Sequence, residues 1–170
     1  MATAKTSTFF IREAINIDAA ATTDSMDLSM YCDPVNRQGL LIRNADFIWY
    51  DGATYLPAAV QGNSYEAAIQ LHAATLGALA EYDNNQQIAS ASIQAGASLP
   101  AVQEVDFFPD RLGMTKGEGR ITVNDTLEIV ADGSANVPAN LECCIVLECQ
   151  VVKLSKEDYV SLALQSVADA

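Results

Sequence analysis

The sequence is short of positive charge. Its 170 residues include nine Lys and Arg against 22 Asp and Glu, which gives a formal net charge of −13. A protein that binds nucleic acid broadly needs clustered cations to neutralise phosphates. The segment Met1–Ile17, where a basic arm could lie, holds only Lys5 and Arg12. We therefore expect no direct binding to nucleic acid.

Long apolar runs are missing as well. The run Phe9-Phe10-Ile11 near the N-terminus is too short for the core of a signal peptide. No window approaches the roughly 18 apolar residues that cross a bilayer. Half of all residues are nevertheless apolar, which argues against disorder. We expect a protein made in the cytosol, without a signal peptide or transmembrane segment. We also expect one domain over residues 1–170, with a flexible N-terminal arm at residues 1–7.

Histidine and cysteine occur in numbers and spacings that suit few metal sites. His72 is the only histidine, and Cys143, Cys144 and Cys149 lie far along the chain from Cys32. Zinc sites use two close cysteine pairs, or cysteine pairs with histidines. The neighbours Cys143 and Cys144 would point to opposite faces of a strand. We expect no metal and no cofactor, and we interpret the cysteines as small apolar side chains.

No set of residues indicates an enzyme. No nucleophile motif such as G-x-S-x-G accompanies His72, so this histidine is predicted to be structural. A cupin-type metal site would need several histidines. A glycosidase needs two suitably spaced carboxylates, but with 22 acids close pairs arise by chance. None stands out among the candidates Asp106, Asp110, Glu118, Glu128, Glu142 and Glu148. We predict that the protein is not an enzyme and has no catalytic residues.

Two loops resemble binding motifs only faintly. Asp132-x-Ser134-x-Asn136 matches the start of a calcium loop but lacks its later glutamate, so a hairpin turn is favoured. The segment Gly113–Gly119 is glycine-rich but matches neither the P-loop nor the dinucleotide motif. We interpret it as a surface loop.

The sequence does contain many short apolar segments separated by turn residues. This pattern predicts an all-β jelly roll or β-sandwich of about eight antiparallel strands, with one or two short helices. The clearest segment is Asn140–Leu154, in which one face is wholly apolar and is predicted to lie in the core. That face consists of Leu141, Cys143, Ile145, Leu147, Cys149 and Val151. The other predicted strands are Thr8–Ile17, Met26–Cys32, Gly39–Tyr50, 65–73, Ile88–Gln94, Val102–Phe108, Arg120–Val123 and Thr126–Val130.

Details of these strands give further expectations. Acids that alternate with apolar residues, such as Asp27 and Glu148, are predicted on solvated outer faces. Both faces of Gly39–Tyr50 carry apolar residues, which predicts partial packing on both sides. Asp51-Gly52 predicts a hairpin turn with glycine at positive φ, followed by a return strand from Tyr55. The stretch Asp18–Asp24 is predicted to be a loop.

Two segments combine helical and strand patterns. The alanine-rich stretch Tyr65–Tyr82 could be one helix capped by Ser64, but its first half alternates. We predict a strand over 65–73 and a short helix over 74–81. The last apolar segment, Tyr159–Val167, follows a polar break with N-cap character and is open to helix or strand.

Four aromatic residues are the candidate interface or ligand residues. Tyr31, Trp49, Tyr50 and Tyr55 are predicted to cluster around the Asp51-Gly52 turn. Aromatic rings near a loop can stack on sugars, or they can fill a core or a subunit contact. We favour the core or subunit contact.

Residues 120–158 carry a family resemblance. The segment Arg120-Ile121-Thr122-Val123-Asn124-Asp125-Thr126-Leu127-Glu128-Ile129, the strand Leu141–Leu154 and the break Ser155-Lys156-Glu157-Asp158 resemble the single jelly-roll major capsid proteins of tailless icosahedral viruses. The resemblance implies strands that stand vertically on a shell enclosing an internal membrane. It implies a structural protein of the virion that self-assembles with copies of itself and with other capsid proteins. A carbohydrate- or ligand-binding β-sandwich module is the alternative.

Overall fold

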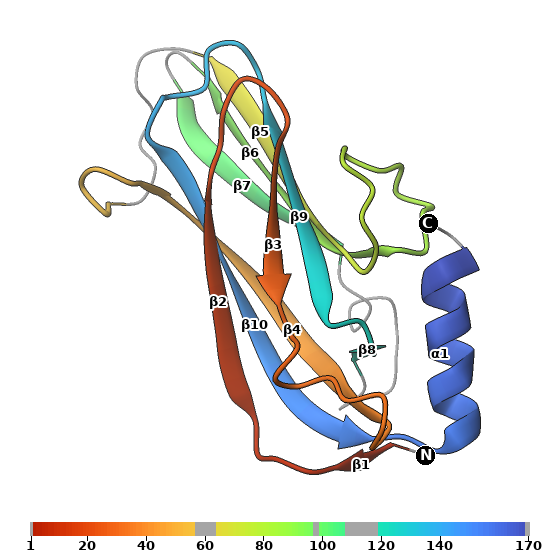
Figure 1. Cartoon of the computed structure of the whole chain (residues 1–170). Coiled ribbons are helices and arrows are strands. Elements are labelled where there is room, and N and C mark those ends of the chain that lie inside the picture. Colours follow the sequence, from red (N-terminus) through yellow and green to blue (C-terminus); the bar gives the residue numbers. More distant parts are fainter. Residues whose placement is uncertain (1, 57–63, 97–98, 108–118, 169–170) are drawn as a thin grey trace.

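The structure is a computed structural model that describes residues 2–56, 64–96, 99–107 and 119–168. Ten strands and one helix form within these residues (Figure 1). The elements are β1 (Thr3–Ala4), β2 (Phe9–Asn16), β3 (Thr22–Asp27), β4 (Gln38–Asp51), β5 (Tyr65–His72), β6 (Gln87–Gly96), β7 (Leu99–Phe107), β8 (Arg120–Thr122), β9 (Thr126–Gly133), β10 (Leu141–Lys153) and α1 (Lys156–Ala168).

The strands form two antiparallel sheets that enclose a common apolar core. Sheet A has the order β2-β10-β4-β8, and β1 pairs with the end of β10 beyond β2. Sheet B has the order β3-β9-β5-β6-β7. The chain changes sheet at every connection from β2 to β5 and again from β7 to β10. Two facing sheets of four strands, β2-β10-β4-β8 and β3-β9-β5-β6, with these connections form a jelly roll. Strand β7 is added at the edge of sheet B. The predicted fold class is confirmed.

Strand β10 is the centre of sheet A. It pairs with β2 on one side and with β4 on the other. Its alternate residues from Leu141 to Val151 are buried, as predicted, because they face the core between the sheets. Cys143 is fully buried and its neighbour Cys144 is half-buried on the opposite face.

A β-bulge in β4 explains why simple alternation along the sequence assigns apolar residues to both faces of this strand. Ile42 pairs with Cys149 and Asn44 pairs with Glu148, so Arg43 is one extra residue in the strand. Such a bulge reverses the alternation of side chains between the two faces. The core-facing side chains are therefore buried both before and after the bulge, while on the opposite face Leu41 is half-buried and Ile48 is 51% exposed. The buried side chains are Leu40, Ile42, Ala45, Phe47 and Trp49.

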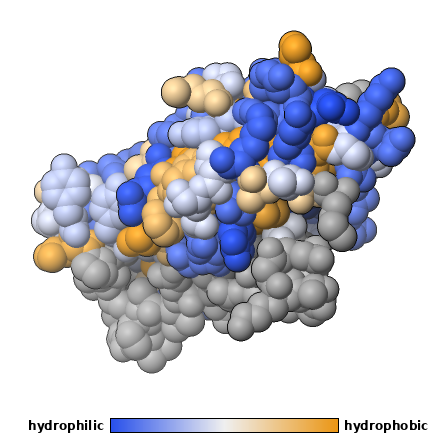
Figure 2. All heavy atoms as spheres, turned by 90° about the horizontal axis from the view of Figure 1, so that it is seen from below, coloured by the Kyte–Doolittle hydropathy of each residue, from blue (hydrophilic) through white to orange (hydrophobic). Residues whose placement is uncertain are grey.

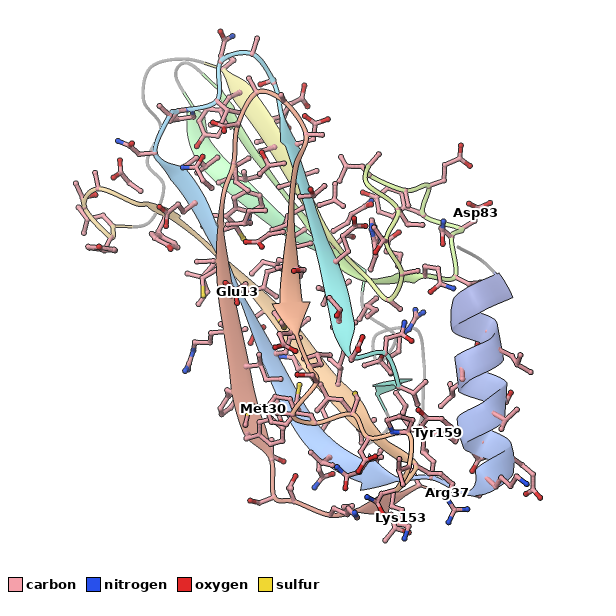
Figure 3. The ribbon with its side chains drawn as sticks, in the orientation of Figure 1. Glu13, Met30, Arg37, Asp83, Lys153 and Tyr159 are labelled. Carbon is pink, nitrogen blue, oxygen red and sulfur yellow. The ribbon has the colours of Figure 1, made fainter. Side chains whose placement is uncertain are left out.

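Strand β3 lies earlier in the chain than predicted. Thr22–Asp27 pairs with β9, so the strand begins inside the predicted loop Asp18–Asp24 and shares only Met26 and Asp27 with the predicted strand Met26–Cys32. Asp27 Oδ1 accepts a hydrogen bond from the Ser29 amide at 2.8 Å, which turns the chain. The apolar alternation continues into this turn, where Met30 is 86% exposed (Figure 3). Alternation alone therefore misplaced the strand.

The turn after β4 also differs from its prediction. Asp51 Oδ1 accepts hydrogen bonds from the amides of Ala53 and Thr54. Positive φ occurs at Tyr55, at 59°, and not at Gly52. A Cβ at position 52 would meet the carboxylate end of the Glu142 side chain, so a larger residue there would require that side chain to move. Tyr55 and Leu56 lie outside any strand, so the predicted return strand does not start there.

The predicted helix over residues 74–81 is wrong, because a network of buried polar side chains forms hydrogen bonds with the backbone of this segment and keeps it non-helical. Glu128 accepts hydrogen bonds from the backbone amides of Leu76, at 2.6 Å, and Gly77, at 3.1 Å. Gln70 exchanges two hydrogen bonds with the backbone of Ala80. His72 is fully buried between these two side chains, 3.0 Å from Gln70 Oε1 and 3.5 Å from Glu128 Oε2. The segment is thus fixed to the outer side of sheet B without helical bonds.

This network predicts a pH dependence of stability. Burial lowers the pKa of His72 below its usual 6.5 and outweighs the opposing attraction of Glu128. The unfolded chain then binds the proton more readily than the folded chain. Stability from neutral His72 is therefore complete above pH 6.5 and is lost as the pH falls through the folded pKa.

We expect the urea midpoint of the protein to fall between about pH 7.5 and about pH 5. The matched variant is His72→Gln, which removes the only histidine, so its midpoint should fall less over the same range. An equal fall in both proteins would contradict this assignment.

Hydrogen bonds position the segments at both ends of the chain. Ser155 Oγ accepts the Asp158 amide at 3.1 Å and caps α1, so Tyr159–Val167 is helical. At 13 residues α1 is too short to cross a membrane, and no described helix is long and apolar enough to do so. At the other end, residues 3–6 bond to β10 and Lys5 Nζ donates to Gln38 Oε1 at 2.6 Å. These bonds place the segment along sheet A, whereas the sequence predicts a flexible arm.

Candidate functional site

The structure separates the four candidate aromatic residues. Trp49 is 3% exposed and belongs to the core. Tyr31 packs against Phe9, with ring centroids 5.0 Å apart, in the turn after β3. Tyr50 and Tyr55 stack on each other at 6.4 Å beside the Asp51-Gly52 turn. Only the last two are brought together where the sequence predicts a cluster, and Tyr55 is 79% exposed.

Tyr50 is held by a carboxylate on the neighbouring strand. Its hydroxyl donates to Glu142 Oε2 at 2.6 Å. This bond, together with partial burial, raises the pKa of Tyr50 well above its usual value. The Tyr50 ring is therefore fixed in orientation at the end of a larger surface formed by three strands.

That surface is the outer face of sheet A, the side of β2, β10 and β4 that points away from the core. Strand register places its residues in four cross-strand rows. The rows are Asn16-Glu142-Tyr50, Ala14-Cys144-Ile48, Arg12-Val146-Asp46 and Phe10-Glu148-Asn44. Apolar side chains form the second row and continue into the next two through Val146 and Phe10. Ile48 is 51% exposed and Phe10 is 59% exposed, so this apolar centre is open to solvent.

The charges on this face are nearly balanced. Arg12 lies 5.8 Å from the centre of the Phe10 ring, in cation–π geometry. Arg43, the bulged residue, lies 3.9 Å from the Glu148 carboxylate. With Asp46 and Glu142, the face carries two cations and three carboxylates, a net charge of −1. The whole chain carries −13.

Sequence reasoning did not select the apolar centre of this face. Phe10 and Ile48 each occur among residues of mixed character, and neither is near a recognisable motif. Phe10 and Ile48 can be assigned to this face only because they alternate with core-facing residues, and for Ile48 this alternation is clear only once the bulge at Arg43 is known. Seen from below in Figure 2, hydrophobic side chains are interspersed with hydrophilic ones on the described surface.

The acids named as candidates for a glycosidase pair are not brought together in the described residues. Glu142 and Glu148 lie on one face of β10, six residues apart, or about 20 Å along a strand. Glu128 lies in the polar network on sheet B. Asp106 is in β7, and Asp110 and Glu118 lie outside the described residues.

The cysteines are all free thiols, and three of them are buried. Burial raises the pKa of Cys32 to about 11 and that of Cys149 to about 12. Across the described ranges no group of three His, Cys, Asp or Glu side chains is placed to hold a metal ion. In the predicted turn at 132–136, Ser134 Oγ accepts the Glu66 amide and links two strands of sheet B.

The similarity of this chain to known proteins is structural and distant. No protein-family model matches the chain, and no curated protein matches it. A solved structure of Desmodium yellow mottle tymovirus is similar, with 11% sequence identity and a TM-score of 0.41. The match covers 88% of this chain and 90% of that one. At this distance the likeness does not extend to function.

Proposed function

We propose that the protein is a structural subunit that self-assembles into a virus capsid shell. The observation that carries the proposal is the outer face of sheet A, which is apolar at its centre and nearly neutral on a strongly acidic protein. The resemblance of residues 120–158 to single jelly-roll capsid proteins supports the viral setting. The role is structural rather than catalytic.

Electrostatics explains why this face suits contact between copies. Two copies with a net charge of −13 each repel one another when they approach through acidic surfaces. The outer face of sheet A carries a net charge of −1 and presents Ile48, Phe10 and Val146. Burying such side chains contributes about 25 cal/mol per Å² of apolar surface. Contact between copies through this face therefore combines weak electrostatic repulsion with the burial of apolar side chains.

The remaining parts of the proposal come from the family resemblance. The partners are further copies of this chain and other capsid proteins, and the assembled location is the virion. An internal membrane lies next to the shell in the resembled family. Direct contact with packaged nucleic acid is not part of the proposal, because the chain has nine cations in 170 residues.

A second function has one observation in its favour. Tyr55, stacked on Tyr50, offers an exposed ring of the kind on which sugars stack. A carbohydrate-binding module would use this pair, whereas the buried Trp49 cannot reach a ligand. Glycan binding that is lost in Tyr55→Ala, in a protein that never assembles, would favour this function over the capsid role.

Assembly is expected to depend on salt. Raising sodium chloride from about 0.05 M to about 1 M shortens the Debye length from roughly 14 Å to 3 Å, which screens repulsion between acidic copies. We expect sedimentation velocity and negative-stain microscopy to show particles or ring-shaped oligomers at high salt and smaller species at low salt. A monomer at every salt concentration, even in concentrated protein, would contradict the capsid proposal.

A further inference from the structure

A cavity opens beside β8, an edge strand of sheet A. Its volume is about 540 Å³, and its walls come from β8, the segment 82–87 and α1. These elements lie on the same side of the sandwich in Figure 1, and Asp83 marks the rim near the helix in Figure 3. The volume falls within the range of small-molecule sites.

The cavity contains a guanidinium without a counter-ion. Arg120 donates hydrogen bonds from its two terminal nitrogens to the backbone carbonyls of Gln87 and Asn85. No described carboxylate forms an ion pair with it, including the exposed Asp83 on the rim. Burial lowers the pKa of Arg120, and no neighbouring carboxylate opposes the shift. A guanidinium has five N–H donors, so two carbonyls leave further donors for an anion.

The same cavity contains an unpaired buried amide. Gln87 is 1% exposed, and neither its Oε1 nor its Nε2 has a hydrogen-bond partner within the described chain. An amide without partners in the interior is costly, so buried amides are normally bonded to protein, water or a ligand. This observation is independent of Arg120 and also indicates that the cavity binds a polar ligand. Further polar side chains in the wall include Asn84 and Thr122.

We propose that this cavity binds a small oxyanion, a carboxylate or phosphate group, with Arg120 as its charge partner and the Gln87 amide as a hydrogen-bond donor. Arginine pairs with both groups through two parallel N–H bonds. The carboxylate could be on a free small molecule or on an acidic side chain of a second copy. The cavity has room for a free anion, and the proposal is for that source.

The test measures thermal melting of the full chain with added sodium phosphate or sodium succinate, at ionic strength matched with sodium chloride. We expect at least one of the two anions to raise the melting temperature by about 5 °C or more once it exceeds its dissociation constant ~100-fold. Isothermal titration then gives the dissociation constant. Arg37→Gln is the matched control, because Arg37 is a half-exposed arginine outside the cavity. It should respond like the parent protein.

Two variants within the cavity decide the assignment. Arg120→Gln should lose the anion response, and Gln87→Leu should fold and bind the same anion about tenfold more weakly. If Arg120→Gln does not fold, the comparison of Gln87→Leu with the parent decides, and equal dissociation constants overturn the proposal. An unchanged response in folded Arg120→Gln, or no response of the parent protein to either anion, also overturns it. The proposal is also overturned if stability rises with protein concentration and not with added anion, and if this rise disappears in Arg120→Gln. In that case the cavity binds an acidic side chain of a second copy.

Discussion

Replacing Ile48 with Asp is expected to abolish assembly while the fold remains intact. Ile48 lies in the apolar row of the outer face of sheet A and is half exposed, so the free subunit loses little packing. In a contact between copies the new carboxylate would be desolvated without a partner, at a cost of about 2 kcal/mol or more. Because 1.4 kcal/mol is a factor of ten, the concentration required for assembly should rise more than about tenfold.

The control is Val35→Asp, which adds the same charge at a residue that is 88% exposed in the turn before β4. Sedimentation velocity at high salt should show assemblies for the parent and for Val35→Asp, and only small species for Ile48→Asp. Melting temperatures should stay close in all three proteins. Normal assembly of Ile48→Asp would remove the outer face of sheet A from the proposed contact.

Replacing Glu128 with Ala is expected to have the largest effect on stability. The residue is 8% exposed, and its carboxylate accepts hydrogen bonds from the amides of Leu76 and Gly77 beside His72. Truncation leaves these groups without their acceptor. We expect a loss of about 3 kcal/mol, since bonds to charged groups contribute about 1.5–3 kcal/mol each. The melting temperature should fall by roughly 6–12 °C.

Glu66→Ala is the matched control, because Glu66 lies on β5 with its side chain exposed. It should change stability by less than about 0.5 kcal/mol. Hydrogen exchange gives a second readout: amides in residues 74–81 should exchange faster in Glu128→Ala than in Glu66→Ala. Equal stabilities of the two variants would show that the Glu128 network does not hold this segment.

The sequence predicted those parts of the fold in which burial follows simple alternation. Strand β10 alternates without interruption, so its buried face and its limits were predictable. Ser155 as the N-cap of α1 was likewise a local signal. In β4, the bulge at Arg43 depends on pairing with residues more than 100 positions away. No local pattern contains that information.

The errors at residues 74–81 and at β3 have the same origin. The Ala-rich stretch has helical propensity, but the carboxylate of Glu128 and the amide of Gln70 satisfy its backbone instead. Strand β3 ends where Asp27 bonds to the Ser29 amide, although the apolar alternation continues. In both places hydrogen bonds between polar side chains and the backbone decide the outcome.

The candidate site was only partly predictable for a similar reason. The stacked pair Tyr50 and Tyr55 lies next to the turn that the sequence identifies. Trp49 and Tyr31 belong elsewhere, because the bulge directs Trp49 into the core and the turn after β3 places Tyr31 against Phe9. The apolar row through Ile48 depends on the registers of three strands, which only the structure supplies.

The central position of β10 determines when sheet A can fold during synthesis. Among the described strands, β2 pairs only with β10, and β10 separates β2 from β4. During synthesis more than 120 residues therefore leave the ribosome before β2 acquires a partner. Such distant pairing forms slowly and leaves apolar strands unprotected in the meantime. An incomplete chain that stops before residue 141 cannot close sheet A, so only finished subunits can present its outer face.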